Sequence, residues 1–446
     1  MKTLLAYLKD YKKESILAPL FKMLEASFEL FVPLVMAAII DVGLANQDKP
    51  YIVKMCFVLI ALGIIGLVCS ITAQYFAAKA ATGFSTRLRH ELFAHIQGLS
   101  YTEMDTLGTS TLITRMTSDI NQVQSGVNLV LRLFLRSPFI VFGAMIMAFT
   151  VDAKAALIFV VTIPLLSIVV FGIMLLTMPL YRRAQAGLDR LLRRTRENLS
   201  GVRVIRAFHK EAEETAQFAE ENESLTRLQL FVGRISALMN PLTYVLINIA
   251  AVVLIWQAGL QVNIGSMQQG QVVALYNYML QIIVELIKLA SLIITLNKSV
   301  ACAERVSGVL AVPTTMNYPA KGGAAKKVTG DAAVTFKNVS FTYAGAGAES
   351  LSDISFTAKR GQTIGIIGGT GSAKSSLVNL ISRLYDVTEG SIKVGGKDVR
   401  SYDMETLRNE VAVVLQKNVL FSGTILDNLR WGDKNASEEE CKRVCR

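Results

Sequence analysis

Charged residues are scarce in this chain of 446 residues. Asp, Glu, Lys and Arg make up 18% of the sequence and hydrophobic residues 52%, whereas an ordinary soluble protein carries roughly 25% charged residues. The apolar excess lies in the first 300 residues, in blocks near the roughly 20 residues that a bilayer-crossing helix needs. This distribution excludes a purely soluble protein. We predict six spans, at about 16–40, 55–80, 127–150, 155–180, 235–258 and 272–297.

Cysteine is also too sparse for a structural role. The chain has five cysteines and three histidines, without the spacing of a disulfide framework or a convincing zinc site. Cys56 and Cys69 fall in apolar helical sequence, where cysteine behaves as a small hydrophobe. We expect neither a disulfide scaffold nor a zinc centre.

Positive charge is concentrated in a few loops. Residues 182–234 hold eleven Lys or Arg, whereas three short loops hold only Lys49 and Lys154. This asymmetry is the positive-inside pattern of membrane proteins. It predicts a protein of the cytoplasmic membrane with both termini in the cytoplasm. The short loops lie near 41–53, 151–154 and 259–270.

The net charge of +11 therefore follows from membrane topology. Nucleic-acid binding needs a basic surface with suitably placed aromatic or recognition elements, and no such platform occurs here. We expect a lipid bilayer as a partner and no nucleic acid.

Two long loops, 81–126 and 181–234, keep an apolar period typical of helices. Segments rich in Ser, Gly and Thr interrupt that period at 100–110 and 198–206. The pattern predicts two helical hairpins that project into the cytoplasm and dock on the C-terminal domain.

Charged residues inside the predicted spans are functional candidates because burying a charge in lipid is costly. Lys22 lies one turn before Glu25, and Glu29 follows four residues later. We expect both glutamates to face the bundle interior, paired with Lys22 or neighbouring basic residues; a role in substrate or proton handling is the alternative. Glu285 and Lys288 are spaced to form a local pair, with substrate contact as the alternative.

The C-terminal part reads as globular sequence after a linker at 313–330. Alternating apolar residues at 334–341 predict one or two strands, and 361–369 predicts a buried strand. This strand runs into "GGTGSAKSS" at 368–376, and 375–385 follows as an amphipathic helix. Strand, Gly-rich loop and helix form the context of a phosphate-binding loop.

The residues of this loop suit a nucleotide with Mg²⁺. Gly369 and Gly371 let backbone N–H groups converge on phosphates, helped by the helix dipole. Lys374 is expected to reach the β- and γ-phosphates, Ser375 to coordinate Mg²⁺ and Ser376 to donate to an α-phosphate oxygen.

Ala373 stands where the strict motif G-x-x-x-x-G-K-[ST] has glycine. If the backbone there has positive φ, the methyl group costs about 1–2 kcal/mol; otherwise the cost is near zero. We expect nucleotide binding to persist, weakened at most about tenfold.

Three segments resemble one family in order and spacing. "FKNVSFTY", "GGTGSAKSSL" and "VLQKNVLFSGTILDNLRWG" are similar to the ATP-binding cassette of exporter-type ABC transporters, and the resemblance covers nearly the whole chain. It implies a membrane all-α six-helix domain at 1–312 and a partial α/β P-loop cassette domain at 331–446.

The resemblance also implies site residues. Tyr343 matches the aromatic residue that stacks on adenine, and Gln416 matches the catalytic glutamine that contacts Mg²⁺ and the attacking water. ATP and Mg²⁺ are the implied cofactors, with Ser375 and Gln416 at the metal. The candidate nucleotide-binding residues are Tyr343, Gly368, Gly369, Thr370, Gly371, Ser372, Ala373, Lys374, Ser375 and Ser376.

The function that the resemblance implies is ATP-driven export of a lipophilic drug, lipid or peptide by alternating access. The chain would act as a half-transporter in a homodimer or heterodimer, with its two hairpins as coupling elements. A nucleotide-gated channel or regulator that binds ATP without hydrolysing it is the alternative.

The resemblance further implies a signature helix, an Mg²⁺-supporting aspartate, a catalytic glutamate and a switch histidine, which residues 1–446 do not contain. We therefore expect a fragment of a longer ATPase that does not turn over ATP by itself.

Overall fold

The computed structural model describes residues 4, 6–319, 331–416 and 419–445. It divides into two compact units. The first comprises residues 1–94 and 112–311, and the second comprises residues 95–111 and 312–446.

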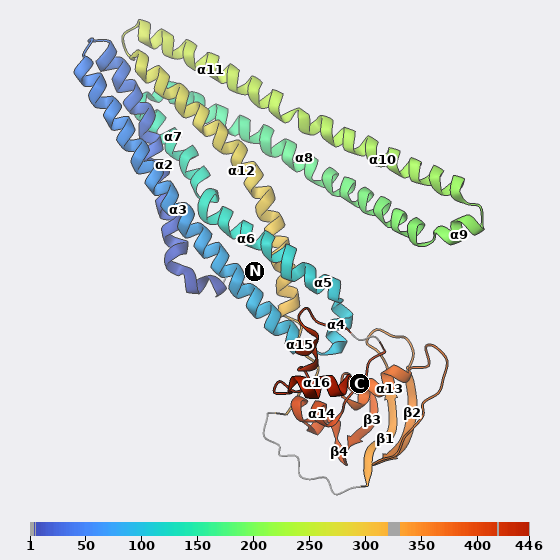
Figure 1. The fold of residues 1–446 in the computed structure, drawn as a ribbon. Helices are drawn as coiled ribbons and strands as arrows, with labels where there is room; N and C mark the ends of the chain where they lie inside the picture. The colour runs from blue at the N-terminus through green and yellow to red at the C-terminus, as the bar shows by residue number, and fades with distance from the viewer. Residues whose placement is uncertain (1–3, 5, 320–330, 417–418, 446) are drawn as a thin grey trace. The chain divides into compact units, whose positions relative to one another are not determined.

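Among the described residues, six helical stretches are long and apolar enough to cross a membrane, which confirms the predicted number of spans (Figure 1). Each stretch is longer than its predicted apolar block because the helix continues past the apolar residues. The stretches are Ala6–Leu44, Lys49–Gly98, Thr109–Val151, Ala153–Ser200, Glu211–Asn263 and Gln269–Leu310.

Several stretches consist of more than one helical element. The elements are η1 (Ala6–Tyr11), α2 (Lys12–Ala38), η2 (Ile39–Leu44), α3 (Lys49–Gly98), α4 (Tyr101–Leu107), α5 (Thr109–Thr114), η3 (Arg115–Asp119), α6 (Ile120–Leu129), η4 (Val130–Phe134), α7 (Arg136–Val151), α8 (Ala153–Ser200), α9 (Val202–Ala207), α10 (Glu211–Ala237), α11 (Met239–Asn263) and α12 (Gln269–Leu310).

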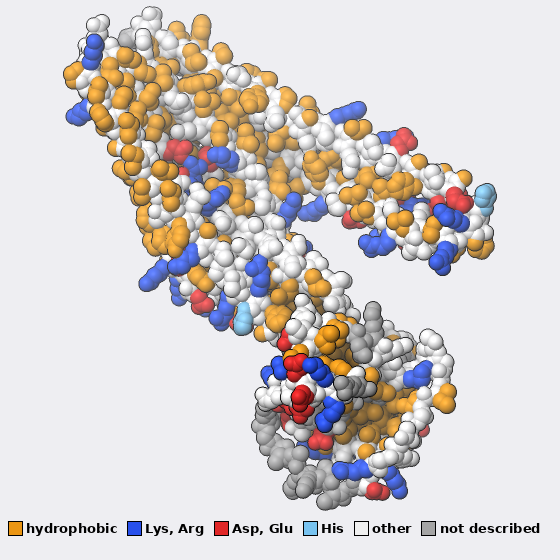
Figure 2. All heavy atoms as spheres, viewed as in Figure 1, with side chains coloured by type: hydrophobic (Ala, Val, Ile, Leu, Met, Phe, Trp, Pro, Cys, Tyr) orange, Lys and Arg blue, Asp and Glu red, His pale blue; other side chains and the backbone are white. Residues whose placement is uncertain are grey.

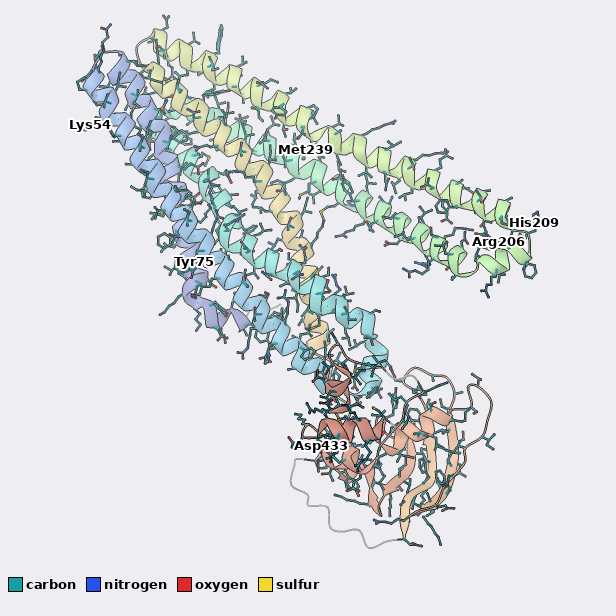
Figure 3. All side chains as sticks on the ribbon, in the orientation of Figure 1. Lys54, Tyr75, Arg206, His209, Met239 and Asp433 are labelled. Carbon is teal, nitrogen blue, oxygen red and sulfur yellow. The ribbon has the colours of Figure 1, made fainter. Side chains whose placement is uncertain are left out.

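The second hairpin is built as the sequence predicts. Helix α8 has 48 residues, or about 72 Å at 1.5 Å per residue, whereas the hydrocarbon core of a bilayer is about 30 Å thick. It therefore extends well past the membrane. Arg206 and His209 lie at the turn of this hairpin, between α8 and α10, and Met239 lies where α10 meets α11 (Figure 3). The Arg194 guanidinium joins the two arms through a 2.7 Å ion pair with Glu221.

The helices of the first unit pack through small side chains. Ala26, Ala144, Ala156 and Ala274 are fully buried, and small residues let membrane helices approach closely. The Tyr278 hydroxyl donates a 2.7 Å hydrogen bond to a backbone carbonyl of α2. Large apolar side chains cover the outward surface of these helices (Figure 2), as a lipid environment requires.

The second unit contains an antiparallel four-stranded sheet of order β2-β1-β3-β4. Phe336 of β1 pairs with Phe356 of β2 on one side and Ile392 of β3 on the other. The elements are β1 (Ala332–Phe341), β2 (Leu351–Lys359), α13 (Lys374–Ile381), β3 (Glu389–Val394), β4 (Lys397–Asp398), η5 (Val399–Ser401), α14 (Met404–Glu410), α15 (Ile425–Leu429) and α16 (Glu438–Val444).

The prediction of a buried strand at 361–369 is wrong in this structure. Residues 363–369 form no strand, and the Ile367 side chain is 99% exposed. The four strands of the sheet pair only with one another, so this segment has no ladder partner among the described residues. A strand of this apolar type needs neighbours and cover on both faces.

The helix predicted at 375–385 is shorter than expected. It begins at Lys374 and ends at Ile381, because Arg383 takes a positive φ of 51° that a right-handed helix does not allow. The chain then turns so that Tyr385 joins the core of the second unit.

Of the predicted linker, residues 320–330 lie outside the described part of the chain. Residues 312–319 follow α12 without regular structure, apart from a bend at Thr315.

Candidate nucleotide site and charged clusters

The backbone of the Gly-rich loop is held in left-handed conformations. Gly371 has φ 86°, and Ala373 has φ 58° and ψ 23° immediately before α13. Of the two cases for Ala373, the structure therefore shows the one in which the methyl group costs about 1–2 kcal/mol.

One glycine of the loop is required by space. A Cβ atom on Gly368 would lie 2.5 Å from the Ser372 Oγ atom. The Ser372 hydroxyl donates to the Gly369 carbonyl at 2.9 Å, which holds that side chain in place. Gly368 thus allows the loop to close on itself.

The Lys374 ammonium lies within the loop. Its Nζ atom donates to the Gly368 carbonyl at 2.9 Å, the Gly369 carbonyl at 2.6 Å and the Ser372 hydroxyl at 3.1 Å. These acceptors hold a positive charge beside the N-terminus of α13. Phosphate oxygens are stronger partners for an ammonium than carbonyls are.

The N-terminus of α13 has unsatisfied amides. No side chain caps this helix, since its N-cap residue is Ala373. The first N–H groups of a helix have no intrahelical acceptor, and they favour an anion. A loop with two left-handed residues, an ammonium and an uncapped helix start fits a phosphate chain.

Tyr343 and Ser376 are brought together by the fold. Their hydroxyl oxygens lie 2.8 Å apart in a hydrogen bond, and the Ser376 side chain is buried. The Tyr343 ring packs edge-on against Phe341 and Tyr385, with centroids 4.7 and 5.3 Å away. Sequence reasoning did not anticipate this pairing, because the two residues are 33 positions apart.

The other candidate residues are exposed. Gly369, Thr370 and Ser375 are exposed to solvent. Gln416 is exposed in an irregular segment and forms no hydrogen bond with the described residues. The structure therefore clusters the loop residues with Tyr343 and does not join Gln416 to them.

Helix α4, in the second unit, contacts Thr315, which precedes the nucleotide loop, and Tyr385, which follows it. The Tyr385 hydroxyl donates to the Asp105 carboxylate at 2.6 Å, and the Tyr101 and Tyr385 ring centroids are 6.0 Å apart. A cavity of about 340 Å³ is lined by Tyr385 and Asp105 and also by Tyr343, Thr102 and Thr315, among others. Tyr385 thus touches both Tyr343 and α4.

Glu103 anchors α4 at its N-terminus. Its Oε2 atom accepts from the Ser100 amide at 2.7 Å, and its Oε1 atom accepts from the Thr315 hydroxyl at 2.5 Å. Burial alone raises the pKa of Glu103, but the hydrogen bonds from Ser100 and Thr315 outweigh it and leave that pKa below its ordinary value. The S-x-x-E spacing of a capping box was the sequence signal for this contact.

The predicted charge pairs in the spans are confirmed. Lys22 Nζ lies 2.6 Å from the Glu25 carboxylate, and Lys288 Nζ lies 3.1 Å from that of Glu285. Glu29 pairs with the Arg136 guanidinium, which also donates to Glu285 at 2.8 Å. The sequence analysis did not single out Arg136, although an arginine within the predicted span 127–150 was the available signal.

The described residues combine six apolar helical stretches with a Gly-rich loop that fits a phosphate chain, an arrangement typical of a membrane protein with a nucleotide-binding domain. The model of the ABC transporter transmembrane region matches residues 15–286, and a second model, described as ABC transporter, matches residues 351–445. The chain belongs to the ABC transporter family, with the membrane region and the ATP-binding domain fused.

Similar proteins carry the same two regions. An uncharacterized ABC transporter ATP-binding protein of Mycobacterium tuberculosis is 36% identical, over 97% of this chain and 75% of its own length. An uncharacterized ABC transporter ATP-binding protein of Bacillus subtilis is 32% identical, over 99% and 76%. A putative multidrug export ATP-binding/permease protein of Bacillus subtilis is 30% identical, over 99% and 77%.

Proposed function

We propose that this protein is the half-transporter of an ATP-driven exporter in the cell membrane. The observation that carries the proposal is a phosphate-binding loop in a chain with six apolar helical stretches. The relatives bear transporter or export names, which favours transport over a nucleotide-gated channel. The proposed substrates are lipophilic drugs, lipids or peptides.

The proposed site residues follow from the loop. Backbone amides from Gly368 to Ser372 and the Lys374 ammonium bind the phosphates of ATP. Ser375 and Gln416 would hold Mg²⁺, which would supply charge neutralisation at the phosphates. Gln416, which the structure does not join to the loop, would have to approach it to contact the metal and position the attacking water. Tyr343 stacks on adenine once its hydroxyl releases Ser376.

The proposed domain boundaries place the membrane domain at 1–312, the linker at 313–330 and the cassette from 331 onward. Both termini and both hairpins lie on the cytoplasmic side, as the distribution of Lys and Arg indicates. Dimerisation with an identical or related chain is part of the proposal, since family resemblance implies two cassettes per transporter.

Helix α4 is the proposed coupling element of the first hairpin. It follows the end of α3 after two residues, and Tyr385 connects it with Tyr343. If nucleotide binding moves the Tyr343 ring, the Tyr385 ring that packs against it would move as well, and α4 would move with Tyr385. This is a population shift that the nucleotide biases through differential contacts.

Substitution of Lys374 tests the proposal. We expect Lys374→Ala in the full-length protein to abolish both ATPase activity and ATP-dependent uptake of a lipophilic dye into inside-out vesicles. The loss follows because no other described cation lies within the loop. Lys397→Ala, at a cassette lysine that lies over the Tyr402 ring, is the control. Retained ATP-driven uptake in Lys374→Ala would refute the proposed site.

A further inference from the structure

A cavity of about 200 Å³ lies among the spanning helices, beside the charged cluster of Arg136. Four polar residues contribute to its wall: Glu29 from α2, and Gln281, Glu285 and Lys288 from α12. Aliphatic side chains of α7 and α12 form the rest of the wall. Figure 2 shows carboxylate and cationic side chains gathered within the hydrophobic surface of these helices.

Glu285 is fully engaged in structural contacts. Its side chain is 5% exposed and accepts from Arg136 at 2.8 Å, from the Ser137 hydroxyl at 2.7 Å and from Lys288 at 3.1 Å. A carboxylate with three such donors has little capacity left for a ligand. Glu285 therefore holds the cluster together.

Glu29 and Gln281 retain acceptor capacity. The Glu29 side chain is 43% exposed, and only its Oε2 atom accepts from a described residue, Arg136. The Gln281 Oε1 atom is buried without a hydrogen-bond partner in the described part of the chain. A buried amide oxygen without a donor is costly, so this side of the cavity favours a ligand with N–H groups.

Lys288 offers the opposite charge in the same cavity. Its side chain is 52% exposed, and its ammonium has three N–H donors, one of which is used by Glu285. Exposed charges at membrane depth mark substrate or ion pathways. The cavity thus offers free acceptor capacity at Glu29 and Gln281, called here the anionic edge, and free donor capacity at Lys288, called the cationic edge.

We propose that this cavity binds the head group of a zwitterionic amphiphile, which carries a primary ammonium and a phosphate or carboxylate on an apolar body. The ammonium donates to Glu29 and Gln281, and the anionic group pairs with Lys288. The inference rests on the proposed export function, because it names the substrate class of that transporter.

Charge balance favours a zwitterion over a simple ion. The cluster of Glu29, Arg136, Glu285 and Lys288 is electrically neutral in itself. A lone cation or anion would add an unbalanced charge to a low-dielectric site. A head group with both charges keeps the site neutral and pairs with both free edges.

Binding to the purified full-length protein in uncharged dodecyl maltoside tests this inference. The probe is radiolabelled lysophosphatidylethanolamine, and its matched partner is lysophosphatidic acid, which lacks the ammonium. We expect the wild-type protein to bind the zwitterion about tenfold more tightly, the ratio for roughly one added ionic hydrogen bond. Equal affinities for the two lipids would overturn the proposal.

Variants separate binding from a merely structural role. Glu29→Gln and Gln281→Leu should remove the preference for the ammonium, whereas Lys288→Gln should weaken both lipids and retain that preference. Glu25→Gln is the matched control, because Glu25 lies one turn earlier on α2 and pairs with Lys22. Wild-type discrimination in both Glu29→Gln and Gln281→Leu would also overturn the proposal.

A second probe identifies the source of the head group. The dipeptide Phe-Leu carries an ammonium and a carboxylate without a lipid chain. Its displacement of the lysolipid assigns the cavity to peptides, and failure to displace it assigns the cavity to lipids. ATP-dependent dye uptake is measured separately, on inside-out vesicles that contain the same variants, so loss of lipid discrimination with intact uptake refutes only this inference.

Discussion

At the scale of single residues, Ala373 shows how the loop departs from its motif. An alanine with φ 58° is strained by its Cβ atom, yet the residue on each side keeps its place: Ser372 bonds to the Gly369 carbonyl and Lys374 starts α13. The strain is local and does not displace the ammonium.

We expect Ala373→Gly to tighten ATP binding, by up to about tenfold, because the left-handed conformation costs glycine nothing. Ala373→Val should weaken it, since a β-branched residue fits this conformation poorly. Titration with a fluorescent ATP analogue measures both. The opposite order of the two affinities would contradict the positive φ of Ala373 as the cause, and Ala436→Gly, in a loop remote in sequence from the site residues, is the control.

At the scale of elements, the contact between α4 and the segment after α12 depends on one carboxylate. Glu103 accepts hydrogen bonds from both Ser100 and Thr315. Each hydrogen bond to a charged group contributes about 1.5–3 kcal/mol to the stability of a folded protein. An ionised Glu103 therefore ties the short helix to the segment after α12.

This contact predicts a pH dependence. Because the folded-state pKa of Glu103 is lowered, its contribution to stability is present above the unfolded-state pKa and is lost as the pH falls through the folded-state value. We expect the thermal midpoint of the wild-type protein to fall in this acid range, and Glu103→Gln to be less stable at pH 7 with a smaller acid-induced change. An equal acid-induced change in the two proteins would exclude Glu103 as its source.

At the scale of the whole molecule, the helical unit depends on a charge network that joins three spanning elements. Arg136 of α7 contacts Glu29 of α2 and Glu285 of α12. Removing one partner of a buried pair leaves an uncompensated charge, at a cost of about 3–5 kcal/mol.

We therefore expect Arg136→Met to lower the thermal stability of the full-length protein sharply. The double variant Arg136→Met with Glu285→Met should recover much of the loss, because apolar replacement of a buried pair is often nearly neutral. Thermal unfolding in detergent measures both proteins. A double variant less stable than Arg136→Met would show that the network contributes more than mutual neutralisation.

The sequence by itself determined the membrane part and the chemistry of the loop. Runs of apolar residues specify spanning helices through hydropathy alone, and Lys374 and Ser375 follow from a short contiguous motif. The pairs Lys22–Glu25 and Glu285–Lys288 were also predictable, because residues three apart share a helix face.

The tertiary structure decided what depends on residues far apart in the chain. It joined Tyr343 to Ser376, Asp105 to Tyr385 and Glu29 to Arg136, none of which a local period specifies. It also left 363–369 out of the sheet, because an apolar run becomes a strand only where a ladder partner lies beside it. The residues that act in a contiguous motif can be identified from the sequence alone. Strand pairing and buried charge networks cannot, because they depend on which distant segments of the chain come into contact.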